Sequence, residues 1–166
     1  LMQFIEITAY ALDGFAFAAE AIVGTAMGAR SRAAFRRGAL LATFWGMIVA
    51  ILLALGFALF GATIIDTMTT ASDVRLEARS YLWWMVLAPL VGLASWMLDG
   101  VFIGATRTRD MRNMMVLSVA VYFGAVWALI PLLGNHGLWA ALLISYVARA
   151  ATLGWKYPAL ERDVAA

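Results

Sequence analysis

The sequence predicts an all-α membrane protein: a polytopic bundle of about five transmembrane helices that forms a single domain over residues 1–166. Composition carries this prediction, because 64% of the residues are hydrophobic and only 13% are charged. In ordinary soluble domains, about 45–50% of the residues are apolar and about 25% are charged. A soluble fold of this length could not bury the apolar surface that a mean hydropathy of +0.88 implies. A lipid bilayer removes that requirement, because apolar side chains can face the hydrocarbon.

Five apolar stretches are long enough to cross about 30 Å of hydrocarbon at about 1.5 Å of helical rise per residue. The predicted helices cover residues 2–29, 38–65, 81–106, 111–133 and 138–155. The second stretch contains no charged residue and gives the clearest signal. The third opens on an aromatic cluster typical of a membrane interface. It also contains Pro89, which predicts a kink because proline has no amide hydrogen.

The connections between these stretches are short and polar. Residues 66–80 form a connector of mixed charge, and residues 134–137 (Gly-Asn-His-Gly) follow Pro131 as a turn. His136 is therefore expected to belong to a loop.

Lys and Arg residues predict how the bundle is oriented. They gather after the first and third stretches, in basic loops 30–37 and 107–112, and in the carboxy-terminal tail. These three segments alternate correctly to share one side of the membrane, and the positive-inside rule places that side in the cytoplasm. The amino end then lies outside, which requires an odd number of earlier helices. Because the chain also starts at Leu1, we expect a fragment of a longer protein.

Three carboxylates lie within the predicted spans, where each charged group costs about 2.5–3.5 kcal/mol to insert. Asp13 and Glu20 are seven residues apart and so share one face of the first helix. Counting back from the basic turns places Glu20 about 15 Å deep and Asp99 about 12 Å deep. These acids either make structural polar contacts between helices or form a cation or proton site lining a cavity. We expect Glu20 to matter most for activity.

Arg149 is the basic residue within the last predicted span. Its side chain either extends to the cytoplasmic surface or points inward as a partner for Glu20 or Asp99. The candidate substrate- or ion-binding residues are therefore Glu20, Asp13, Asp99 and Arg149.

Other functional classes find little support in the sequence. The chain has no Cys and a single His, which excludes disulfides, thiolate zinc sites and multi-histidine metal sites. The basic residues form no continuous stripe for a nucleic acid. No catalytic constellation lies within the spans, so we do not expect an enzyme.

Three segments resemble the multidrug and toxic compound extrusion (MATE) family, in particular its DNA-damage-inducible branch. They are LDGFAFAAEAIVGTAMGARSRAAFRR at residues 12–37, LDGVFIGATRTRDMRNMM at 98–115 and LLGNHGLWAALL at 132–143. The resemblance implies a transporter of two six-helix lobes in the bacterial inner membrane. It would exchange a cationic or amphipathic organic compound for protons or sodium, without a bound cofactor. This chain would supply helices eight to twelve, part of the carboxy-terminal lobe.

The resemblance also implies partners that lie outside this chain: the amino-terminal lobe and the preceding helix of the same transporter. Two alternatives remain open. One is a flippase of a lipid-linked precursor, a group that shares the superfamily architecture. The other is a structural membrane subunit whose acids only hold helices together.

Overall fold

A computed structural model describes residues 1–164, over which the chain forms six helices. They are α1 (Met2–Gly28), α2 (Arg32–Met68), α3 (Ser72–Ser80), α4 (Leu82–Gly104), α5 (Thr108–Leu133) and α6 (Asn135–Asp163). All except α3 are long and apolar enough to cross a membrane. The predicted all-α class with five spans is confirmed.

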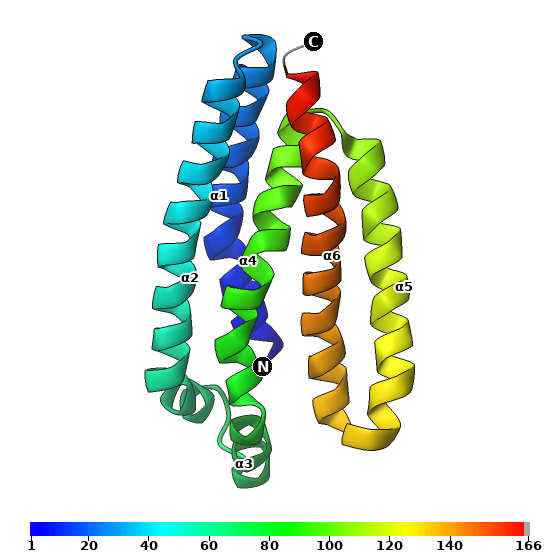
Figure 1. Ribbon diagram of the computed structural model, residues 1–166. Helices are drawn as coiled ribbons and strands as arrows, with labels where there is room; N and C mark the ends of the chain where they lie inside the picture. The colour runs from blue at the N-terminus through cyan, green and yellow to red at the C-terminus, as the bar shows by residue number, and fades with distance from the viewer. Residues whose placement is uncertain (165–166) are drawn as a thin grey trace.

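Helix α4 occupies the centre of the bundle (Figure 1). It packs against α1 and α2 on one side and against α6 on the other, while α5 packs mainly on α6. Eleven residues of α4 are buried, whereas Ser118 is the one buried residue of α5. The central position of α4 therefore gives its polar residues the least contact with lipid.

The basic loop 30–37 is mostly helical, which differs from the prediction. Helix α2 begins at Arg32, six residues before the apolar stretch, because the Ser31 hydroxyl caps it by accepting a hydrogen bond from the Ala34 amide at 3.3 Å. Two residues after the end of α1, Arg30 has a positive φ of 50°. The amide of Ser31 then donates to the Ala26 carbonyl at 3.0 Å, which closes a Schellman-type turn.

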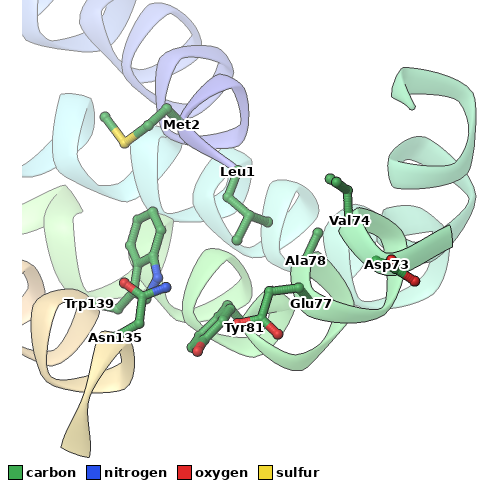
Figure 2. A pocket seen from close by; sticks show the side chains of 9 residues that line it. All are labelled: Leu1, Met2, Asp73, Val74, Glu77, Ala78, Tyr81, Asn135 and Trp139. Atoms are coloured by element: carbon green, nitrogen blue, oxygen red, sulfur yellow. The ribbon is translucent and has the colours of Figure 1, made fainter. Parts of the chain in front are cut away.

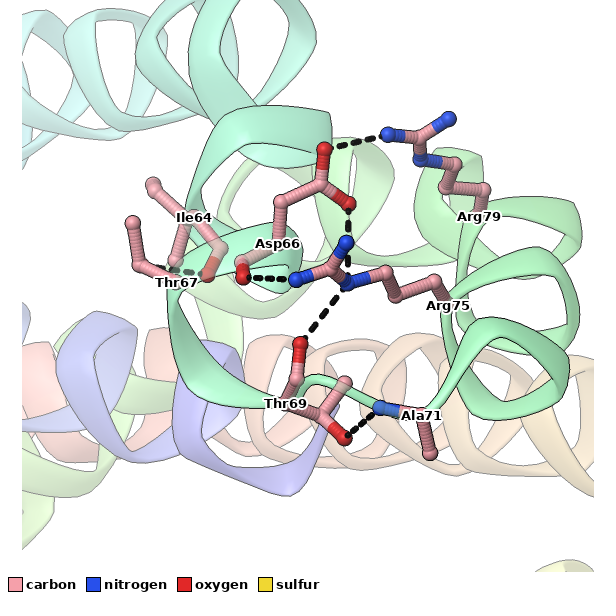
Figure 3. A network of polar contacts seen from close by, with 7 residues as sticks. All are labelled: Ile64, Asp66, Thr67, Thr69, Ala71, Arg75 and Arg79. Carbon is pink, nitrogen blue, oxygen red and sulfur yellow. Dashed lines mark hydrogen bonds and ion pairs between the residues drawn. The ribbon is translucent and has the colours of Figure 1, made fainter.

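The polar connector 66–80 folds back onto the end of α2 instead of forming an irregular loop (Figure 3). It contains α3, whose Arg75 donates hydrogen bonds to the backbone carbonyls of Asp66 at 2.8 Å and Thr69 at 2.7 Å. Arg79 pairs with the Asp66 carboxylate at 2.5 Å. The mixed charge of this segment thus satisfies the carbonyl groups that the end of α2 leaves free.

The turn between α5 and α6 is tighter than predicted. Gly134 alone separates the two helices, and its φ of 57° with ψ of −134° lies in a region that residues with a side chain avoid. The assignment of His136 to a loop is wrong, because α6 already begins at Asn135. The His136 ring accepts a hydrogen bond from the indole of Trp84 at 3.0 Å, which ties the start of α6 to α4.

The three basic segments meet at one end of the bundle, as their alternation along the chain predicted. Arg36 of α2 pairs with the buried Glu161 of α6. Arg107, between α4 and α5, pairs with Asp163. Helix α6 continues to Asp163, beyond the predicted end at residue 155, so that these acids reach the basic turns. Ion pairs therefore join the start of α2 and the α4–α5 turn to the end of α6.

Candidate functional site

An ion pair crosses the middle of the bundle between α4 and α6. The Nη2 atom of Arg149 lies 2.7 Å from the Oδ2 atom of Asp99. Asp99 is only 8% exposed, and the Arg149 side chain is 19% exposed. Of the two orientations that the sequence left open for Arg149, the structure has the inward one, with Asp99 as the partner.

This ion pair uses one oxygen and one nitrogen only. The Oδ1 atom of Asp99 and the Nε atom of Arg149 are both buried, and neither has a hydrogen-bond partner among the described residues. A guanidinium and a carboxylate that are built to stay together usually form two parallel hydrogen bonds. A buried polar atom without a partner is costly, by about 1–3 kcal/mol. Oδ1 of Asp99 is therefore available as a hydrogen-bond acceptor, and Nε of Arg149 is available as a donor.

Two glycines of α4 bring α1 into direct backbone contact beside this pair. A Cβ atom added at Gly100 would lie 2.3 Å from the carbonyl oxygen of Ala16, and one at Gly104 would lie 2.3 Å from that of Glu20. Such close approach is typical of helices that associate through small residues four apart. The two matched contacts also show that α1 and α4 run parallel.

The same contacts set the relative depths of the three acids. Glu20 is level with Gly104, in the last turn of α4, whereas Asp99 lies five residues earlier, about 7.5 Å further from that end. The sequence analysis placed Glu20 and Asp99 at nearly equal depths, whereas in the structure their levels differ by about 7.5 Å. The predicted depths assumed that α1 and α4 end at the same level, whereas α1 extends further (Figure 1).

Asp13 is the acid that α1 brings toward Asp99. It lies three residues before Ala16, which is level with Gly100, and its charge is close enough to Asp99 to repel it. Both Asp13 and Glu20 are half-buried, and neither forms an ion pair within residues 1–164. The structure thus pairs Asp99 with Arg149, places Asp13 on the neighbouring helix α1 and leaves Glu20 nearer the basic end.

A small cavity of about 160 Å³ adjoins Arg149 between α5 and α6. Its polar lining consists of four hydroxyl groups and the Arg149 side chain; the hydroxyls belong to Ser118, Tyr122, Ser145 and Tyr146. The sequence analysis did not identify this cavity. Ser118 and Tyr122 lie one helical turn apart on α5, whereas Ser145 and Tyr146 are adjacent on α6, and only the α5–α6 packing brings the two sets together.

A larger cavity of about 580 Å³ opens at the end of the bundle opposite the basic segments. Figure 2 shows the start of α1, helix α3 and the start of α6 around it, with Tyr81 and Trp139 among the lining side chains. None of the four candidate residues lines this cavity. Within the described residues, no group of three or more His, Asp or Glu side chains is placed to hold a metal ion.

Comparisons with known proteins agree with the resemblance seen in the sequence. The model of the family described as MatE matches residues 1–130. The chain is also 41% identical over 161 residues to DNA damage-inducible protein F of Escherichia coli strain K12. That match covers 92% of this chain but 33% of the relative, so the chain spans about a third of the relative's length. No solved structure matches. The chain belongs to the MatE family of membrane proteins.

Proposed function

We propose that this chain forms most of one lobe of a secondary transporter that exports cationic or amphipathic organic compounds by antiport with protons or sodium. The observation that carries the proposal is Asp99, a buried carboxylate in the central membrane helix with an oxygen that has no hydrogen-bond partner in the described part of the chain. Membership of the MatE family supports transport rather than an enzymatic reaction.

The acids offer the chemistry that antiport needs. A deprotonated carboxylate attracts a cation, and binding of a proton or of sodium removes that attraction. If the organic cation and the coupling ion use the same carboxylate, the binding of one favours the release of the other. Asp13, on the neighbouring helix α1, adds to the negative potential at Asp99.

The Asp99–Arg149 pair also favours a second candidate function. A carboxylate that already has a basic partner could simply hold α4 and α6 together, as in a structural membrane subunit. The atoms left without partners count against this alternative, because a purely structural pair gains from saturating both groups. A lipid-linked precursor flippase would favour a strongly cationic cavity, whereas Asp99 neutralises the one arginine at this site.

The proposal is tested by export of ethidium, a fluorescent organic cation. Expression of the full reading frame that contains this segment should lower the ethidium retained by loaded cells. The segment 1–166 alone, purified into liposomes, should show no saturable uptake, because the substrate path of a two-lobe transporter lies between its halves. Retention unchanged by the full-length protein, or saturable uptake by the segment alone, would contradict the proposal.

We further propose that the basic end of the bundle faces the cytoplasm in a bacterial inner membrane. The chain has no cysteine of its own, so single cysteines can report the side on which a residue lies. An impermeant thiol reagent applied to intact spheroplasts should label Asn135→Cys and leave Ala29→Cys unlabelled until the membrane is opened. Both positions are exposed, at opposite ends of the bundle. The reverse labelling pattern would overturn the orientation.

A further inference from the structure

We propose that Arg149 is a tethered counter-ion that competes with the transported cation for Asp99, and that the α5–α6 cavity receives its guanidinium when the cation displaces it. This inference rests on the proposed function, because it assumes that Asp99 binds a cation. It adds that Arg149 sets the affinity for the cation and that the α5–α6 cavity accepts the displaced Arg149 side chain.

The contact between the two side chains is suited to exchange. An ion-pair contact of 2.7 Å joins Nη2 of Arg149 to Oδ2 of Asp99, while Oδ1 of Asp99 and Nε of Arg149 are buried and have no hydrogen-bond partner among residues 1–164. A cation that reaches the site can therefore contact Oδ1 before the ion pair at Oδ2 breaks. Arginine cannot lose its proton at physiological pH, so it leaves Asp99 only by moving to another set of acceptors.

The cavity between α5 and α6 supplies such acceptors. The Ser118 hydroxyl donates its hydrogen to the Met114 carbonyl at 2.8 Å, and the Ser145 hydroxyl donates to the Leu142 carbonyl at 2.6 Å. Since both hydrogens are already used, these oxygens can offer only lone pairs to the cavity. A guanidinium has five donors and no acceptor, so it complements this lining.

The space is adequate for the proposed movement. The cavity holds about 160 Å³ and already includes Arg149 in its wall. A water molecule in the liquid takes about 30 Å³, so several waters or one guanidinium group fit. The Arg149 side chain thus needs to turn from α4 toward α5 without any shift of the α6 backbone.

A tethered competitor lowers the apparent affinity for the cation by the fraction of time for which Asp99 is free. If Arg149 occupies Asp99 about nine-tenths of the time, its removal strengthens cation binding about tenfold. Neutral compounds gain nothing from the exchange, because they cannot replace the positive charge. Arg149 would therefore select for cations as well as set their affinity.

The test measures equilibrium binding of radiolabelled tetraphenylphosphonium to the purified full-length protein. Arg149→Gln should lower the Kd about tenfold, and Arg149→Lys, which keeps a competing charge, should stay near the wild-type value. Arg162→Gln is the matched control, because it removes an exposed guanidinium from the same helix. Asp99→Asn should raise the Kd strongly, with or without Arg149→Gln.

A second variant tests the cavity and does not remove the ion pair. Ser145→Leu fills the cavity and should hold Arg149 on Asp99, which raises the Kd for tetraphenylphosphonium. Adding Arg149→Gln to Ser145→Leu should restore tight binding, which a merely structural role for Arg149 would not produce.

The possible results separate the inference from the function on which it rests. Unchanged binding in Asp99→Asn contradicts a cation site at Asp99. Weaker binding in Asp99→Asn, together with a Kd in Arg149→Gln that stays at or above the wild-type value, overturns the competing role of Arg149 alone. If Arg149→Gln does not yield folded protein, unaltered binding in Ser145→Leu overturns it equally.

Discussion

Replacing Gly100 by alanine is expected to cause a large loss of stability in this bundle. The new Cβ would lie 2.3 Å from the Ala16 carbonyl oxygen and 2.9 Å from the Ala16 carbonyl carbon. Both atoms belong to the backbone of α1, so no side chain can turn away to make room. Overpacking of this kind costs about 1–3 kcal/mol and occasionally more. Because both contacting groups are helical backbone, we expect the upper part of that range.

The measurement is the melting temperature of the full-length protein in detergent, followed by size-exclusion chromatography after heating. Gly124→Ala and Gly154→Ala are matched controls, because nothing lies within 4 Å of the added Cβ at either position. Alanine is the better helix former by about 1 kcal/mol, so these controls should be neutral or slightly stabilising. If Gly100→Ala melts no lower than the two controls, α1 and α4 are not in backbone contact.

The number and order of the spans could be predicted from hydropathy because of a constraint that the bilayer imposes. In hydrocarbon, the backbone must satisfy its own hydrogen bonds, so a long apolar stretch becomes a helix. Hydropathy locates the part of a helix that lies in lipid, however, and not the whole helix. Helices α2 and α6 therefore extend beyond their predicted ranges through polar turns, held by the Ser31 cap and by Glu161 and Asp163.

The members of the candidate site could be predicted, but their arrangement could not. Asp13, Asp99 and Arg149 stood out because a charge is expensive within a span. The level of Asp13 and Glu20 relative to Asp99 depends on the register of α1 against α4, which the contacts of Gly100 and Gly104 set between segments far apart in the sequence. The Asp99–Arg149 pair depends on the packing of α4 against α6. The spacing of these two glycines is a signal that sequence analysis could have used. The same spacing also occurs at Gly24 and Gly28 on α1, of which only Gly24 approaches α4.

His136 shows a different limit. A histidine in the sequence Gly-Asn-His-Gly suggests a loop, and the local pattern contains nothing to contradict this. Its actual role depends on Trp84, which is 52 residues away and donates a hydrogen bond to its ring. The ring of Tyr81 also packs against it, with ring centres 4.4 Å apart. Such a contact cannot be read from the sequence near either residue.

The register also changes which acid we expect to matter most. Sequence analysis favoured Glu20, which has no basic neighbour and lies among alanines. The structure makes the stronger case for Asp99, which is the most buried of the three and has an oxygen without a hydrogen-bond partner among residues 1–164. Glu20 lies level with the end of α4 and has more contact with the surroundings of the bundle.

Asp99→Asn is therefore expected to reduce ethidium export by the full-length protein by about tenfold or more, since one lost charge interaction of about 1.4 kcal/mol already gives a factor of ten. Asparagine has nearly the same volume, and its carbonyl oxygen can still accept a hydrogen bond from Arg149, so loss of packing would not explain the defect. Asp13→Asn should have a smaller effect in the same direction. Glu20→Gln should have the smallest effect of the three.

The most direct test of a cation site at Asp99 is the pH dependence of tetraphenylphosphonium binding between about pH 5 and about pH 8. A carboxylate binds a cation only when it is deprotonated, so the affinity of the wild-type full-length protein should fall as the pH is lowered. Asp99→Asn should bind weakly at every pH and lose this dependence, while Glu20→Gln keeps it. Wild-type affinity and wild-type pH dependence in Asp99→Asn would contradict the account and leave Asp99 as a structural partner of Arg149.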